Sequence, residues 1–159
     1  MSQIVFDFKD LITHCLHDEE NSFTNSISSE IDSKVFISEL LQNFQLTCQE
    51  TELKELLRQE HFHIVKNPYI IGKIKKLVDK PYLNFERLCQ IPLGQTPRLY
   101  GNLKKIKHSD YYLFKALIFD PNHLIYNDQN FNKLKNLTCL FSKKDCSETR
   151  KMGQKSKKK

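Results

Sequence analysis

Two pairs of lysines, each interleaved with aromatic residues, are the part of this sequence whose spacing could do chemistry. Lys73 and Lys75 fall in one apolar segment, and Lys105 and Lys107 fall in another. Residues two apart share a face of a strand, so each pair would place two ammonium groups side by side. Proteins that bind single-stranded nucleic acids combine such lysines with aromatic stacking platforms. The aromatic residues near these lysines are Tyr69, Tyr82, Phe85, Tyr100, Tyr111 and Tyr112.

A second interpretation of the same residues is purely structural. A barrel of this size needs large side chains inside it, so most of the aromatic residues would form its core. The lysines would then be the solvated outer face of the same strands. The sequence leaves both interpretations open.

The remaining reactive residue types form no recognisable catalytic or metal-binding arrangement. His14, Cys15 and His17 lack the second ligand pair that a zinc site needs. Cys15 and Cys89 would be nucleophiles only beside a positioned base, and cysteine more often serves as a small buried hydrophobic residue. No glycine-rich phosphate loop occurs. We therefore expect a protein that is not an enzyme and that holds no metal or cofactor.

Short alternating segments predict the strands that would carry the lysines. These segments are 61–65, 69–78, 82–88, 98–107 and 111–119. The last two flank the polar sequence His108-Ser109-Asp110 and predict a β-hairpin. Gly72 and Gly101 lie inside two of the segments, where glycine marks a bulge or a tight bend. This pattern favours a small OB-like antiparallel barrel.

Helices are expected on both sides of this barrel. The apolar spacing in 34–46 is close to a helical stripe, and 47–60 predicts a helix with a capping box. Asp128 would cap a final amphipathic helix that runs to residue 141. Residues 1–17 fit a strand or a helix equally. The expected fold class is mainly β with flanking helices, an acidic helical N-terminal part and a C-terminal amphipathic helix.

Charge is distributed unevenly along the 159 residues, whose net charge is +6. Residues 1–60 hold 4 Lys/Arg and 12 Asp/Glu, residues 61–141 hold 13 and 5, and residues 142–159 hold 8 and 2. The basic parts favour a polyanionic partner, although the front and middle could neutralise each other within one fold. We expect an N-terminal segment and acidic loop at 1–33, an OB-like domain with flanking helices at 34–141, and a disordered basic tail at 142–159. The tail could bind phosphates, direct localisation or only add solubility.

Cysteine usage and hydropathy indicate the compartment. The chain has five cysteines, an odd number, and no CxxC motif, which fits a reducing environment better than a disulfide framework. No signal peptide is recognisable, and no apolar run approaches the roughly 20 residues that cross a membrane. We expect a soluble intracellular protein with no membrane partner.

The segment 98–141 has an order of features that can be compared with a known family. Leu99-Tyr100-Gly101-Asn102-Leu103 is followed by an aromatic and aliphatic strand, an Asp-Pro-Asn break, and the amphipathic segment that begins near Asp128. This order resembles the C-terminal half of the smallest subunit of the telomeric CST complex, an RPA-like trimer of OB-fold proteins. In that family the last helix packs on the middle-sized OB subunit. The resemblance places Phe131, Leu134, Leu137 and Phe141 at this contact.

The resemblance implies a function that the lysines alone do not. It implies a non-enzymatic small OB-fold subunit of a nuclear, telomere single-stranded-DNA-binding complex, which docks on a larger OB-fold partner and supports telomere maintenance and C-strand synthesis. The Lys, Asn and Gln usage resembles ciliate proteins, which implies a telomerase-associated version. Contact with single-stranded DNA would be weak, made mainly through the complex, and would involve Lys73, Lys75, Lys105 and Lys107. The alternative is an accessory DNA-binding subunit of a nuclear DNA-modifying enzyme complex, with 34–60 and the basic tail on duplex DNA.

Overall fold

The structure is a computed structural model of the whole chain. It describes residues 3–28, 30–49, 63–81, 85, 87–134 and 136–140. Along the chain these residues form β1 (Gln3–Asp7), β2 (His17–Asp18), β3 (Phe23–Thr24), β4 (Ile27–Ser28), α1 (Ser33–Gln49), β5 (His63–Ile64), α3 (Pro68–Val78), β6 (Leu88–Pro92), β7 (Arg98–Lys105), β8 (Tyr111–Asp120), the 3₁₀ helix η1 (Asp128–Lys133) and β9 (Leu137–Thr138).

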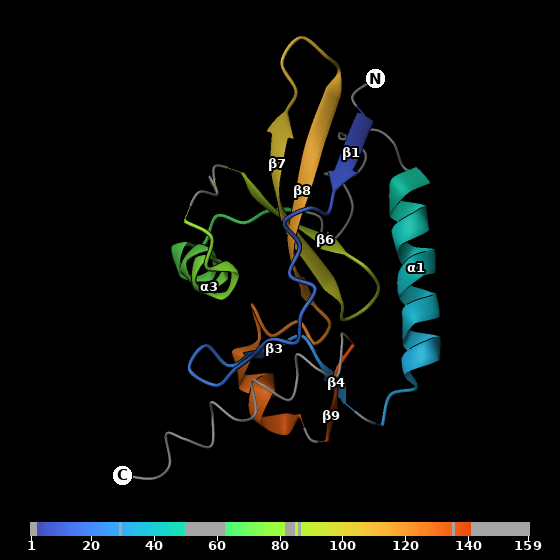
Figure 1. Cartoon of the computed structure of the whole chain (residues 1–159), viewed down its shortest axis with the longest axis vertical. Helices are drawn as coiled ribbons and strands as arrows, with labels where there is room; N and C mark the ends of the chain where they lie inside the picture. The colour runs from blue at the N-terminus through green and yellow to red at the C-terminus, as the bar shows by residue number, and fades with distance from the viewer. Residues whose placement is uncertain are drawn as a thin grey trace.

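A five-stranded mixed sheet forms the centre of the fold, with strand order β1-β8-β7-β6-β5 (Figure 1). Strands β5 to β8 pair antiparallel, whereas β1 runs parallel to β8. Two short ribbons, β2–β3 and β4–β9, lie outside this sheet. The prediction of a mainly β fold with flanking helices is therefore confirmed. In the described part of the chain the sheet is open, because no pairing joins β1 to β5.

The two faces of the sheet are covered by different helices, which lie on opposite sides of it in Figure 1. Helix α1 packs Phe36, Leu40 and Phe44 against one buried cluster, which includes Phe114. Helix α3 packs against the other cluster, and its buried apolar residues are Ile70, Ile74, Leu77 and Val78. Successive side chains of a strand point to opposite faces, so β6, β7 and β8 supply residues to both clusters.

The segment 69–78 is a helix, so its prediction as a strand was wrong. The side chain of Asn67 accepts a hydrogen bond from the Tyr69 N–H, and Pro68 occupies the first helical turn. Both features favour the start of a helix. The helix ends at Asp79, whose φ of 45° is left-handed. Its β-branched residues bury one helical face in the core, and this burial outweighs their preference for strands.

Two other helical predictions are revised. Helix α1 covers the segment 34–46 as expected, but it continues through Thr47 to Gln49, so the prediction that a second helix starts at a capping box there was wrong. Residues 50–60 lie outside the described residues. The final amphipathic helix was wrong: η1 spans only six residues, and the chain then enters β9, which pairs with β4. Asn136, with a left-handed φ of 50°, interrupts the helical path between the two.

The N-terminal region takes part in the central sheet and in the core. Residues 1–33 were expected to form a segment and an acidic loop, and they contribute β1 to the central sheet. Phe23 and Ile27 of the same region are fully buried. The expected basic tail at 142–159 lies outside the described residues.

The predicted hairpin is confirmed, and so is the glycine bulge at Gly101. Strands β7 and β8 pair along their length, with an irregularity between Tyr100 and Gly101. The backbones approach so closely there that a Cβ built on Gly101 would lie 2.5 Å from the Lys115 carbonyl oxygen and 2.5 Å from the Phe114 ring. Gly72 lies inside α3, so its apparent match to Gly101 was wrong.

The carboxylate of Asp120 closes the turn that follows β8. It accepts hydrogen bonds from the backbone N–H groups of Asn122, Leu124 and Ile125. Burial raises the pKa of Asp120 to about 6, and these hydrogen bonds together with the Lys73 charge act in the opposite direction. The folded protein therefore holds this proton more tightly than the unfolded chain does.

This raised pKa makes stability depend on pH with a definite sign. The contribution is complete below about pH 4, and it is lost as the pH rises through 6, because the buried carboxyl then ionises. We expect the free energy of unfolding of the wild type to fall relative to Asp120→Asn by about 3 kcal/mol between pH 4 and 7. Urea unfolding of both proteins across this range measures the difference. A difference that stays constant or grows with pH would contradict the prediction.

Candidate nucleic-acid interface

The four predicted nucleic-acid-binding lysines lie in two separate places. Lys73 and Lys75 belong to helix α3, whereas Lys105 ends β7 and Lys107 lies in the turn that follows. Within a helix, residues two apart point to nearly opposite sides. The first pair therefore does not share a face, and the prediction that Lys73 and Lys75 lie side by side on one strand was wrong.

Lys73 points into the protein and is only 4% exposed. Its Nζ donates a hydrogen bond to the Leu124 carbonyl oxygen at 2.9 Å. Burial lowers the pKa of this ammonium group, against the attraction of nearby carboxylates that include Asp128 and Asp120. A nucleic-acid backbone on the protein surface cannot reach a side chain placed in this way.

Lys75 is exposed on α3 and has an aromatic neighbour. Its Nζ lies 5.5 Å from the centre of the Phe85 ring, which is a cation–π distance. The Lys75 ammonium group thus interacts with the face of the Phe85 ring. Lys75 can contribute a positive charge to the surface, and it stands on a different element from the hairpin lysines.

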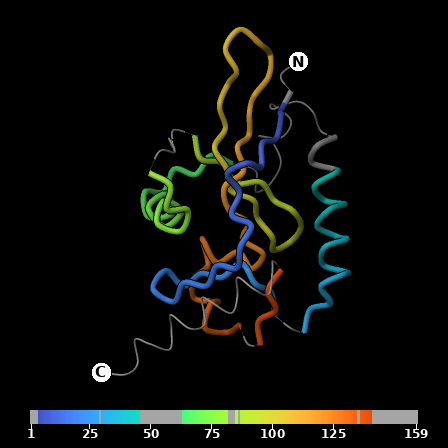
Figure 2. The backbone as a smooth tube through the Cα atoms, in the orientation of Figure 1, coloured from blue at the N-terminus to red at the C-terminus, as the bar shows by residue number. Residues whose placement is uncertain are grey.

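The tip of the β7–β8 hairpin gathers the second pair of lysines with other exposed residues. Strand β6 pairs with β7 only as far as Asn102, so the hairpin continues beyond β6 and away from the helices (Figures 1 and 2). Lys105 lies opposite Tyr112 in the register. The exposed residues of the tip are Lys104, Lys105, Ile106, Lys107, His108, Asp110 and Tyr111. We call this set the hairpin tip.

Local hydrogen bonds hold the hairpin tip in one conformation. The Ile106 N–H donates to the Tyr111 carbonyl oxygen at 3.0 Å and closes the turn. The hydroxyl of Ser109 donates to the Ile106 carbonyl oxygen at 3.1 Å and accepts from the Tyr111 N–H at 3.2 Å. His108 adopts a left-handed φ of 59° between them. A defined turn lowers the entropy that the tip would lose on binding a ligand.

Tyr111 is the tip's aromatic residue, and it is 44% exposed. The other described aromatic residues singled out from the sequence are placed differently. Tyr100 is fully buried and donates a hydrogen bond to Gln90 at 2.8 Å, while Phe85 and Tyr112 are half-buried. Tyr69 is exposed on α3, and Tyr82 lies outside the described residues. Tyr100 is therefore a core residue, as the structural interpretation expects. Tyr111 is exposed beside the tip lysines, so it stays a candidate for stacking on a base.

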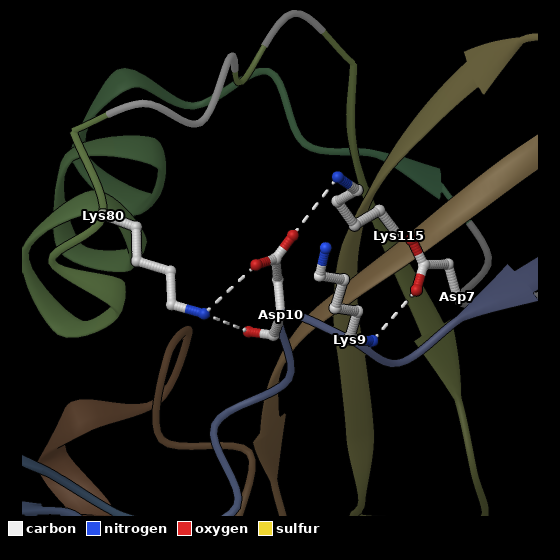
Figure 3. A network of polar contacts seen from close by, with 5 residues as sticks. All are labelled: Asp7, Lys9, Asp10, Lys80 and Lys115. Atoms are coloured by element: carbon white, nitrogen blue, oxygen red, sulfur yellow. Dashed lines mark hydrogen bonds and ion pairs between the residues drawn. The ribbon is translucent and has the colours of Figure 1, made fainter.

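Two further lysines near the sheet form ion pairs with the same carboxylate. Asp10 lies 3.2 Å from the Lys115 Nζ and 3.4 Å from the Lys80 Nζ, and its backbone carbonyl accepts a third bond from Lys80 (Figure 3). Burial alone would raise the pKa of Asp10, but its bonds to Lys115 and Lys80 outweigh burial and lower the pKa. This network ties β8 to the segments after β1 and α3. It leaves the hairpin tip as the more strongly basic surface.

Two of the predicted partner-contact residues pack on this chain's own core. Phe131 and Leu134 are half-buried against the cluster beneath α3, and the Phe131 ring centre lies 5.4 Å from that of His17. Leu137 pairs with Ser28 in the β4–β9 ribbon. Phe141 lies outside the described residues. The structure therefore makes Phe131 and Leu134 part of this chain's own packing, and contact of the four residues with a partner stays a prediction.

Sequence reasoning gave Lys104 and His108 no role at the tip. The signal was present, because Lys104-Lys105-Ile106-Lys107-His108 places four basic side chains in five residues at the end of a predicted strand. Strand alternation drew attention to residues two apart, whereas a hairpin end exposes consecutive residues. The run of basic residues at a turn was therefore the better guide.

Metal-binding groups and membrane-spanning helices were also sought among the described residues. No group of three His, Cys, Asp or Glu side chains among them is placed to hold a metal ion. No described helix is long and apolar enough to cross a membrane.

The fold and this surface define a small β-rich protein whose central sheet carries a basic hairpin turn at one end. The chain belongs to the family described as "Uncharacterised protein UU032", whose model matches residues 7–148. No curated protein and no solved structure matches the chain.

Proposed function

We propose that this protein is a non-enzymatic binding protein that contacts single-stranded nucleic acid through the hairpin tip. The observation that carries this proposal is the joint exposure of Lys104, Lys105 and Lys107 beside Tyr111. Three ammonium groups favour a phosphate backbone, and the tyrosine offers a face on which one base can stack. Asp110 is the acidic residue in the same tip and reduces its net charge.

The single-stranded form is favoured by the mixture of charge and aromatic surface. A duplex hides the faces of its bases, so Tyr111 would have nothing to stack on. A single strand exposes both phosphates and base faces. A two-stranded hairpin can also enter the major groove of a duplex, so the exposed ring of Tyr111 is the feature that favours the single strand.

The finer features of the proposal are an OB-like architecture and membership of a telomeric complex. The antiparallel order of β6, β7 and β8 and the bulge at Gly101 support an OB-like relationship. The resemblance of 98–141 to the smallest CST subunit supports a nuclear partner that carries larger OB folds, with C-strand synthesis as the process served. In that setting the hairpin tip would add a weak contact to DNA that the partner holds.

The first test is direct binding of the full chain to a fluorescent single-stranded oligonucleotide, in DNA and in RNA form, followed by anisotropy. We expect measurable affinity at 50 mM salt, with a slope of about −2 for the logarithm of affinity against the logarithm of salt concentration, because three lysines meet phosphates at roughly −0.7 each. An absence of binding, or a slope near zero, would contradict the proposal. Tighter binding to a duplex of the same length would instead favour an accessory DNA-binding subunit of an enzyme complex.

The partner is tested separately, by affinity capture of the tagged protein from its own cells. Recovery of larger OB-fold proteins supports the telomeric proposal. Recovery of a DNA-modifying enzyme supports the accessory-subunit alternative. Substitutions at Phe131 or Leu134 are unsuitable here, because both side chains pack on the chain's own core.

A further inference from the structure

A pocket on the exposed side of α3 is a second place that could bind a ligand, separate from the hairpin tip. Its volume is about 380 Å³, which lies within the range of small-molecule sites. One wall is a single face of α3, formed by Tyr69, Gly72, Lys73 and Lys76 at helical spacing. Glu20, from the β2–β3 turn, and Asp128, at the start of η1, complete the charged lining.

Gly72 keeps this pocket open at a cost to the helix. Glycine is the least favourable residue inside a helix apart from proline. A Cβ added to Gly72 would meet no atom within 4 Å, so packing does not require glycine at this position. The missing side chain leaves room in the pocket, and a helix-weakening residue at that point is explained if a ligand uses the space.

The lining offers groups of both charges, and some of them are already held in place. Lys73 is buried with its Nζ on the Leu124 carbonyl, which fixes it in the wall. The hydroxyl of Tyr69 donates a hydrogen bond to Asp128 at 3.2 Å. Lys76 is exposed and can meet an anionic group, and Glu20 and Asp128 can accept from N–H or O–H donors. The two carboxylates would repel a bare anion, so a ligand of this pocket must also bring hydrogen-bond donors.

We propose that this pocket binds a nucleoside monophosphate. The phosphate would lie at Lys76, which is exposed, the flat base would lie over Gly72 beside the Tyr69 ring, and the amino and hydroxyl donors would face Asp128 and Glu20. The inference uses no residue of the hairpin tip, so it stands or falls separately from the proposed function.

Thermal unfolding of the full chain with the four common 5′-nucleoside monophosphates tests this inference. We expect a saturable rise in Tm with at least one of them at millimolar concentration, and a smaller rise with the nucleoside or with ribose 5-phosphate alone. An absence of any rise would overturn the inference. An equal rise with ribose 5-phosphate would also overturn it, because it would show a phosphate site without base recognition.

Two variants locate the binding. Gly72→Leu fills the pocket and is expected to abolish the rise in Tm, while circular dichroism confirms that the fold is kept. Lys76→Ala is expected to weaken nucleotide binding about fivefold, and Lys66→Ala, an exposed lysine before α3, should leave it unchanged. If Gly72→Leu unfolds the chain, the Lys76 and Lys66 variants decide the question alone. A nucleotide effect equal in the Lys76 and Lys66 variants would place the site elsewhere and overturn the inference.

The oligonucleotide assay separates the two proposals. Gly72→Leu should lose nucleotide binding and keep the affinity for the single strand that the hairpin tip provides. Loss of oligonucleotide binding in hairpin variants, with nucleotide binding unchanged, is the complementary result. Loss of both in either variant would show one shared site and overturn the inference of a separate pocket.

Discussion

Replacing Lys105 and Lys107 together by glutamate is expected to weaken single-strand binding by about a hundredfold at 50 mM salt. Each substitution removes an attraction to phosphate and adds a repulsion, and both lie on an exposed tip where the backbone fold does not depend on them. The loss should shrink as salt rises, since screening weakens attraction and repulsion alike. Anisotropy at several salt concentrations measures both effects.

The matched control changes the net charge equally at another place. Lys34 lies on α1 and Lys66 precedes α3, and both are exposed. Glutamate at these two positions should reduce affinity only severalfold, through the general field of the protein. If the control variant loses as much affinity as the hairpin variant, net charge alone drives the binding and the hairpin tip has no special role.

Gly101→Ala is expected to lower the free energy of unfolding by about 2–3 kcal/mol. The added methyl group would lie 2.5 Å from the Lys115 carbonyl oxygen, a backbone atom of the central strand pair. The Phe114 ring, which is fully buried, blocks the same position and cannot move into solvent. Relief therefore requires the β7–β8 register to shift. Urea unfolding monitored by circular dichroism measures the loss.

A second glycine provides the comparison for this substitution. Gly72→Ala adds the same methyl group where no atom lies within 4 Å, and it replaces a helix-interior glycine. It should stabilise the protein by about 0.5–1 kcal/mol. If Gly101→Ala is as stable as the wild type, the two strands do not approach at the bulge as closely as these distances indicate.

The hairpin and its bulge could be predicted because local sequence determines both. Alternating apolar residues on either side of a polar turn define β7 and β8, and Gly101 lies where a side chain does not fit. The strand-like composition of 69–78 gave the wrong result, because Asn67 and Pro68 start a helix there and burial of Ile70 and Ile74 completes it. The capping residues were a stronger local signal than the β-branched ones.

The site was harder to predict because it depends on contacts between distant parts of the chain. Lys73 looked equivalent to Lys75 in the sequence, and only packing against the Leu124 segment buries it. The short η1 helix likewise depends on β9 pairing with β4, more than a hundred residues earlier in the chain. Hydrophobic spacing in 128–141 carries no information about that pairing. The hairpin lysines were found because their exposure follows from local structure alone.

The most direct test of the central proposal is photo-crosslinking of a halogenated single-stranded oligonucleotide to the full chain, with the attached residue identified by mass spectrometry. The proposal predicts that the crosslink falls within the hairpin tip, with Tyr111 as the main site because its ring can stack on a base. A bound oligonucleotide that crosslinks only outside residues 104–111 would contradict it.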